Sequence, residues 1–153
     1  AGDTDLLKRL ITLVGKSRYR ALVNVGDYKN DYTDIPPNVI IEDWYPQPSV
    51  IPQVDAVIHH GGNNSFTECL YFGKPAIIMP YVWDGHDNAM RVQETGYGFR
   101  SDRYEWTDEE MIAKIEACLT NAEMAEKLGK ISKHMQSCEG PKKAAKLLAG
   151  LVE

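Results

Sequence analysis

The sequence predicts an α/β fold in which one parallel sheet carries helices on both faces. Short runs of β-branched and apolar residues alternate along the chain with stretches of helical periodicity, which is typical of parallel sheets. The strand-like runs are almost continuously apolar, as expected for strands that are buried on both faces. Polar loops follow several of these runs, and ligands of such folds bind beyond the carboxyl ends of the strands.

Five strands and the helices between them follow from this pattern. The first helix is expected where apolar residues recur at helical spacing, at Leu6, Leu7, Leu10, Ile11 and Val14. Asp3 or Thr4 can cap it and Gly15 can end it. Strands are expected over residues 19–25, 39–41, 55–59 and 76–79, with a short fifth strand near Phe99. A helical turn is expected at residues 49–52, and helices at 65–72 and 86–95.

Beyond the fifth strand the pattern becomes helical. Thr107 and Glu110 have the spacing of a capping box, in which each side chain binds a backbone N–H of the first turn. Two further helices are expected near residues 122–136 and 141–152, the last with Pro141 in its first turn. The sequence therefore predicts a parallel sheet followed by extra C-terminal helices.

Length and composition limit the classes of protein. The 153 residues suit a single domain, expected to span residues 1–153. Seventeen Lys and Arg against 22 Asp and Glu give a net charge of −5, which argues against a nucleic-acid partner. The sequence has neither an apolar run of membrane-spanning length nor a signal-peptide pattern, so we expect a cytoplasmic protein with no membrane segment. The acids of Asp3-Thr4-Asp5 suit a helix start, and no metal ion is expected.

The stretch HHGGNNS, residues 59–65, leaves a predicted strand and enters a predicted helix. Its two glycines let the backbone approach a ligand closely, and the helix start offers unpaired N–H groups and the positive end of the dipole. Such a junction binds anions, most often phosphate, and His60, Asn64 and Ser65 can add side-chain donors. The alternative is a glycine turn followed by an ordinary Asn or Ser cap.

Glu68 lies three residues after Ser65, on the same side of that predicted helix. Its carboxylate could accept hydrogen bonds from the hydroxyls of a ribose, as an acid does in dinucleotide-binding folds. Local spacing supports equally well a capping box in which Glu68 is the partner of Ser65.

Two further loops carry candidate ligand contacts. Trp44, in a proline-stiffened loop, offers a flat face for a base, although a buried tryptophan that plugs the loop is the alternative. Gln47 can both donate and accept, which suits a uracil edge or a ribose hydroxyl. In a later loop, Asp84 could accept bidentate hydrogen bonds from sugar hydroxyls or be a solvated charge, and Asp87 or Asn88 could cap the next helix.

Together these loops resemble the donor-binding signature of UDP-dependent glycosyltransferases. This family includes UDP-glucuronosyltransferases, plant secondary-product glucosyltransferases and bacterial macrolide glycosyltransferases. The matching motifs are Trp44-x-Pro-Gln47, His60-Gly-Gly-x-Asn64-Ser65-x-x-Glu68, Gly73-x-Pro75, and Pro80 with Asp84 and Asn88-Ala89. The resemblance implies the C-terminal, donor-binding half of a GT-B fold, which consists of two Rossmann-like domains that face each other across a cleft.

The resemblance also implies a role for each matching residue. Trp44 would stack on uracil, Gln47 would contact the nucleoside and Glu68 would hold the ribose. Asp84 would contact the sugar. The diphosphate would be bound by His60, Gly62, Asn64 and Ser65.

The sequence departs from the family pattern at two places. The family usually has Gln after the sugar-binding acid, whereas Gly85 follows Asp84 here, so sugar recognition is weakened, altered or passed to His86. The family's domain also opens with an apolar strand, and this chain begins just past it, so we expect that strand to be absent and a sheet edge to be exposed. The family's catalytic base is a histidine of the N-terminal domain, and no catalytic residue is therefore expected in this chain.

The expected function is that of the UDP-sugar-binding half of a metal-independent, inverting glycosyltransferase. It would transfer a hexose to an acceptor hydroxyl, would need an N-terminal acceptor-binding domain or chain as its partner, and would be inactive alone. No cofactor is implied besides the UDP-sugar substrate. The alternative is a non-catalytic nucleotide-sugar-binding subunit that acts with a separate acceptor-binding chain. A nucleotide-sugar epimerase half shares the fold but would lack the Trp-x-Pro-Gln loop.

Overall fold

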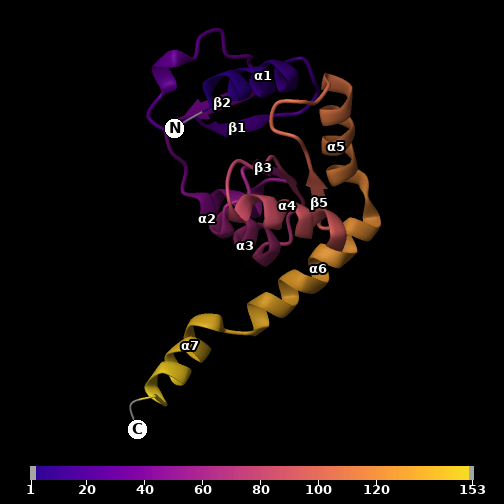
Figure 1. Ribbon diagram of the computed structural model, residues 1–153. Helices are drawn as coiled ribbons and strands as arrows, with labels where there is room; N and C mark the ends of the chain where they lie inside the picture. Colours follow the sequence, from indigo (N-terminus) through magenta and orange to yellow (C-terminus); the bar gives the residue numbers. More distant parts are fainter. Residues whose placement is uncertain (1–2, 152–153) are drawn as a thin grey trace. The chain divides into compact units, whose positions relative to one another are not determined.

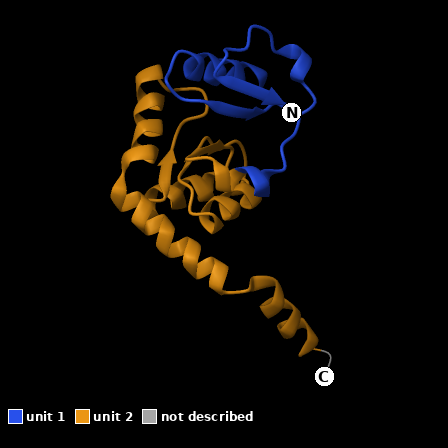
Figure 2. Cartoon of the chain, turned by 180° about the vertical axis from the view of Figure 1, so that it is seen from behind, with its two compact units in different colours: residues 1–50 blue, residues 51–153 orange. Residues whose placement is uncertain are grey.

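The predicted α/β class is confirmed by the computed structural model, which describes residues 3–151. The chain divides into two units, residues 1–50 and residues 51–153, each built from helices and parallel strands (Figure 2). Within the described residues, hydrogen bonds group the strands into a two-stranded sheet in unit 1 and a three-stranded sheet in unit 2.

Unit 1 contains a helix packed on two parallel strands (Figure 1). Its helix is capped as predicted, because the Asp3 carboxylate accepts a hydrogen bond from the Leu6 N–H at 3.5 Å. The strands pair with Ala21 opposite Val39. The elements in order are α1 Thr4–Gly15, β1 Ala21–Asn24, the 3₁₀ turn η1 Lys29–Asp31, β2 Val39–Glu42 and α2 Gln47–Val50.

Burial in unit 1 alternates along the strands. Side chains of α1 form a buried cluster with Val39 and Ile41 of β2. Leu22 and Ile40, which lie opposite each other in the pairing register, are 45% and 56% exposed. Successive side chains of a strand point to opposite faces, so α1 covers one face of this sheet and the Leu22–Ile40 pair belongs to the other.

Unit 2 is centred on a buried strand. β4 lies between β3 and β5, and its three residues are all buried. Side chains of α3 and α4 form a buried cluster with Ala76 and Ile78, and α5 also contacts β4. The elements up to this point are the 3₁₀ turn η2 Ile51–Gln53, β3 Val57–His59, α3 Asn63–Tyr71, β4 Ala76–Ile78, α4 Asp84–Thr95 and β5 Gly98–Arg100.

Three C-terminal helices follow β5, as the sequence predicts. They are α5 Asp108–Thr120, α6 Ala122–Ser137 and α7 Gly140–Ala149. α6 packs against α3, and the Ser132 hydroxyl and the Gln136 amide both donate to the Tyr71 carbonyl, at 2.6 and 2.9 Å. Along α7 the residues are exposed.

No helix within residues 3–151 combines the length and the apolar character needed to cross a bilayer.

The predicted capping box at the start of α5 is present, and it generates a stability prediction. The Thr107 hydroxyl accepts from the Glu110 N–H at 3.1 Å, and the Glu110 carboxylate accepts from the Thr107 N–H at 2.8 Å. Thr107→Ala removes one acceptor and should lower the free energy of unfolding by about 1 kcal/mol, measured by urea denaturation. Thr120→Ala, at the other end of the same helix, is the matched control and should change it by less than about 0.5 kcal/mol. Equal losses in the two variants would contradict the prediction.

Candidate functional site

The predicted ligand-binding residues fall in both units. Trp44 and Gln47 belong to unit 1. The predicted diphosphate, ribose and sugar contacts, from His60 to His86, belong to unit 2. Each group has its own local geometry.

In unit 1, Trp44 presents its indole to solvent. Its side chain is 71% exposed, so the alternative of a buried tryptophan that plugs the loop is wrong. The loop around it is held at both sides, because the Tyr45 hydroxyl donates to the Ile40 carbonyl at 3.3 Å and the Asp43 carboxylate accepts from the Lys29 N–H at 3.1 Å. Gln47 follows as the first residue of α2 and is partly buried. An exposed aromatic face on an ordered loop is suited to stacking on a planar ligand.

In unit 2, α3 begins two residues earlier than expected, and this changes the local assignments. Its N-cap is Gly62, which makes no side-chain capping bond, so Asn64 and Ser65 lie inside the first turn. The alternative of an ordinary Asn or Ser cap is therefore wrong. A capping box joins the N-cap to the third helical residue, so it cannot pair Ser65, already the third residue, with Glu68, the sixth. Both of these side chains are partly buried.

The turn before α3 touches the start of α4 backbone to backbone. Gly61 has a φ of +92°, and a Cβ on it would lie 2.7 Å from the Gly85 Cα. A Cβ on Gly85 would lie 2.7 Å from the His60 carbonyl oxygen. Both distances are too short for a side chain, so the two glycines permit this approach. The contact provides a structural reason for glycine at position 85.

Hydrogen bonds from α4 hold the same turn. The Asn88 amide, buried in the interior, donates to the Gly61 carbonyl at 2.7 Å and to the Asn63 side-chain oxygen at 2.9 Å. The Asp84 carboxylate accepts from the Asn63 N–H at 3.3 Å. Because α4 starts at Asp84, with Trp83 as its N-cap, neither Asp87 nor Asn88 caps it. Asp84 is likewise not merely a solvated loop charge, since it contacts the first turn of α3.

His59 orders the turn from the strand side, a role that the sequence interpretation missed. Its Nδ1 accepts from the Gly61 N–H at 3.0 Å. Burial, together with a smaller effect of the neighbouring His60, lowers the pKa of His59 to about 4. The ring is therefore neutral at pH 7, with its proton on Nε2. The only feature of the sequence that could have indicated this role is the position of the histidine, at a strand end and two residues before a glycine turn.

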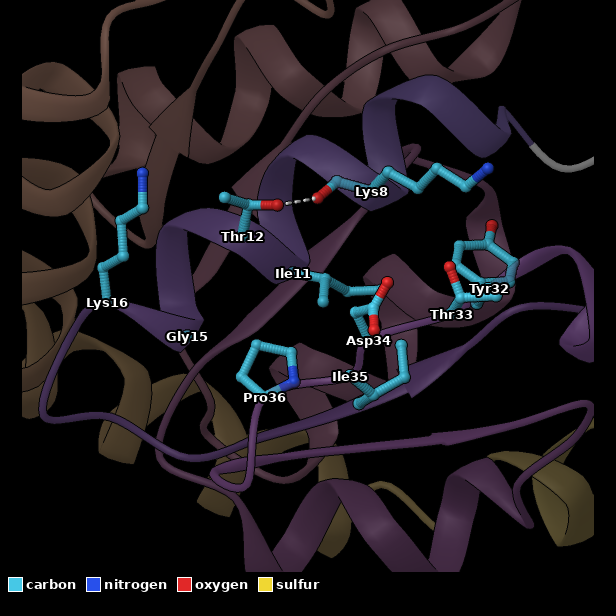
Figure 3. A pocket seen from close by; sticks show the side chains of 10 residues that line it. All are labelled: Lys8, Ile11, Thr12, Gly15, Lys16, Tyr32, Thr33, Asp34, Ile35 and Pro36. Atoms are coloured by element: carbon cyan, nitrogen blue, oxygen red, sulfur yellow. Dashed lines mark hydrogen bonds between the residues drawn. The ribbon is translucent and has the colours of Figure 1, made fainter.

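Each unit also has an open pocket. In unit 1, a pocket of about 450 Å³ lies between α1 and the segment from Tyr32 to Pro36 (Figure 3), and none of the predicted ligand-binding residues lines it. In unit 2, a pocket of about 270 Å³ lies where β4 and β5 end. We call it the β5 pocket. His86 is the predicted sugar contact that lines it.

The shifted pKa of His59 predicts a stability that depends on pH. Its folded-state pKa of about 4 lies below the ordinary value of 6.5, so the unfolded chain binds this proton more tightly. The contribution of His59 to the free energy of unfolding is fully present above pH 6.5 and is lost as the pH falls toward 4. Between pH 7.5 and pH 5, His59 should account for a loss of up to about 2 kcal/mol in the free energy of unfolding, measured by urea denaturation.

His59→Asn tests this assignment because Oδ1 of asparagine can take the place of Nδ1 as acceptor while the titration is removed. The acid-induced loss should shrink in this variant. His134→Asn, on the exposed side of α6, is the matched control and should retain the wild-type loss. A wild-type loss in His59→Asn would show that other groups cause the acid sensitivity.

Comparisons with known proteins agree with this fold. A family model described as "Erythromycin biosynthesis protein CIII-like, C-terminal domain" matches residues 19–151. The NDP-glycosyltransferase YjiC of Bacillus subtilis is 27% identical over 143 residues, which are 92% of this chain and 36% of the relative. The chain spans about a third of the length of such curated relatives.

Solved glycosyltransferase structures share the fold. The calicheamicin glycosyltransferase CalG4 superposes with a TM-score of 0.90 over 98% of this chain and 40% of its own, at 19% sequence identity. The glycosyltransferase VinC, solved in complex with DTDP, has a TM-score of 0.72 over 80% of this chain and 31% of its own, at 22% identity. The fold is thus that of one half of a GT-B glycosyltransferase. With a family model matched over residues 19–151, the chain belongs to the erythromycin biosynthesis protein CIII-like C-terminal domain family of glycosyltransferases.

Proposed function

We propose that this chain binds a UDP-sugar and is the donor-binding half of a glycosyltransferase. The observation that carries the proposal is the start of α3, where a glycine N-cap makes no side-chain capping bond and polar residues surround the first turn. The names of the relatives support it, since YjiC is an NDP-glycosyltransferase and VinC was solved with DTDP, a pyrimidine nucleoside diphosphate like UDP.

The diphosphate would bind at the first turn of α3. The first N–H groups of a helix have no acceptor inside the helix, and the helix dipole places partial positive charge there. Asp84 already accepts from the Asn63 N–H, so the diphosphate would bind further along the turn, at Asn64 and Ser65. His60 is exposed beside Gly62 and would add a donor.

The nucleoside would be held by groups with matching chemistry. The exposed indole of Trp44 would stack on uracil, and Gln47 would contact the nucleoside. Glu68 would accept hydrogen bonds from the ribose hydroxyls. The sugar would be held by Asp84 and His86, since Asp84 contacts the same turn that would bind the diphosphate.

The proposed reaction is a displacement with inversion at the anomeric carbon. The acceptor oxygen forms a bond to this carbon while the bond to the β-phosphate oxygen breaks, and the electron pair leaves with UDP. The acceptor proton would pass to a histidine of an N-terminal acceptor-binding domain or chain. The positive end of α3 and His60 would stabilise the charge that develops on the diphosphate, which is why we propose a mechanism without a metal ion. This chain would be inactive alone.

Calorimetric titration of UDP into the purified chain tests the proposal. We expect saturable binding to the wild type. Trp44→Ala should weaken it roughly 5- to 100-fold, because stacking of a base on an aromatic ring contributes about 1–3 kcal/mol. Glu68→Ala should weaken it roughly tenfold or more, because hydrogen bonds to a charged group contribute about 1.5–3 kcal/mol.

The matched control is Glu109→Ala, which removes an exposed acid from the first turn of α5 and should leave UDP affinity unchanged. Folded protein that binds no UDP at millimolar concentration would overturn the proposed function. Binding that neither Trp44→Ala nor Glu68→Ala weakens would overturn the assignment of these two residues.

A further inference from the structure

The loop between β4 and α4 exposes three apolar side chains in a row, those of Tyr81, Val82 and Trp83. Tyr81 lines the β5 pocket and has a partner there, because the Arg103 guanidinium lies 4.8 Å from the centroid of its ring. Trp83 differs from it. Of the large apolar side chains within residues 3–151, its indole is the most exposed, at 86%. Burial in the core of unit 2 therefore does not account for a tryptophan at this position.

The backbone of Trp83 is strained. The Gly85 N–H donates to the Val82 carbonyl at 3.0 Å, which closes a turn of four residues with Trp83 in its second position, and the His86 N–H donates to the Trp83 carbonyl at 3.0 Å. Trp83 has a φ of +42° and a ψ of −119°. These angles are near those of the second position of a type II′ turn, which favours glycine. A bulky residue rarely has a positive φ, because its Cβ crowds the backbone.

The other residues with positive φ have side chains or backbone angles that make it less costly. Apart from glycines, they are Asp27, Asp34 and Glu139 within residues 3–151. Short side chains such as Asp tolerate this region because they can bond to the local backbone, and Glu139 adopts the ordinary left-handed helical angles. Trp83 alone among them is aromatic. Backbone strain of this kind is concentrated at sites that bind ligands.

Contacts with the neighbouring turn hold Trp83 in this conformation. The Asp84 carboxylate accepts from the Asn63 N–H at 3.3 Å. The backbone of Gly85 approaches the His60 carbonyl so closely that a Cβ on it would lie 2.7 Å from the oxygen. The two residues after Trp83 are thus fixed to the turn that opens α3, where the diphosphate would bind. Trp83 is therefore held one residue from Asp84, the proposed sugar contact.

We propose that the indole of Trp83 packs against the C–H face of the donor sugar and so contributes to sugar selection. This inference rests on the proposed function and adds a specificity-determining residue to it. A pyranose ring presents C–H groups along one face, and these pack favourably on the electron-rich face of an aromatic ring. Gly85 offers no side chain to the sugar. Trp83 would supply a contact to the ring while Asp84 accepts from its hydroxyls.

Calorimetric titrations with UDP and UDP-glucose, together with thermal unfolding of the free chain, test the proposal. Trp83→Gly should weaken binding of UDP-glucose roughly 3- to 10-fold, as expected for loss of one aromatic contact, and leave the affinity for UDP unchanged. The same variant should raise the Tm by roughly 2–4 °C, because glycine adopts a positive φ without strain. A loss of affinity together with a gain in stability is the result that a functional role predicts.

Three further variants separate the indole from the backbone. Trp83→Ala removes the ring but keeps a Cβ, so it should lose the same affinity for UDP-glucose without the gain in Tm. Trp83→Phe keeps an aromatic ring and should retain most of that affinity. Asp34→Gly is the matched control for the backbone, because Asp34 also has a positive φ, of +54°, and is none of the predicted ligand-binding residues. It should leave both affinities unchanged.

Each outcome supports or overturns a named claim. Absence of UDP binding to the folded wild type would overturn the proposed function together with this inference. If wild type binds UDP, equal weakening of UDP and UDP-glucose in Trp83→Gly would assign the indole to the nucleotide and overturn the inference alone. Unchanged affinities for both ligands in Trp83→Gly and Trp83→Ala would also overturn it. A Tm that falls in Trp83→Gly would contradict the strain on which the argument rests.

Discussion

The buried amide of Asn88 is the interaction on which the unit 2 site depends. It binds the Gly61 carbonyl and the Asn63 side chain, and so joins the start of α4 to the turn that opens α3. The join is possible because Gly61 and Gly85 allow the two backbones to touch. An amide that is buried with both bonds made is costly to replace, since any substitute leaves a polar group unsatisfied. The proposed diphosphate contacts, and Asp84 beside them, take their positions from this arrangement.

The class of the fold and the order of its elements could be predicted because they depend on local patterns. Helical periodicity, a capping box and apolar strand runs all act within a few residues, and α5 begins at the predicted cap. Burial in unit 1 could not be predicted in the same way. The sequence of β1 and β2 suits burial on both faces, but exposure of Leu22 and Ile40 depends on which helices cover the sheet, and that is a tertiary property.

In the candidate site, too, the residues could be predicted from local patterns but most of their contacts could not. The sequence singled out the residues at the strand ends, but the partners of Asp84 and Asn88 lie more than twenty positions away from them in the chain. Asn88 is of a residue type that is common at helix caps, but its amide donates to the Gly61 carbonyl. His59 ends β3, as the sequence predicts, and its side chain in addition accepts from the Gly61 N–H. Gly85 stands where the family usually has Gln. In this structure a glycine is required there, because a side chain would collide with the His60 carbonyl oxygen. Local spacing cannot reveal such contacts between neighbouring loops.

The central claim is that the first turn of α3 binds the diphosphate of UDP. Backbone amide chemical shifts of the isotope-labelled chain, recorded by NMR during addition of UDP, test this directly. The account predicts that the largest shift changes within unit 2 occur at residues 61–65, with smaller ones along α5 and α6. Shift changes that leave residues 61–65 unaffected, or that gather at the pocket between α1 and residues 32–36, would contradict it.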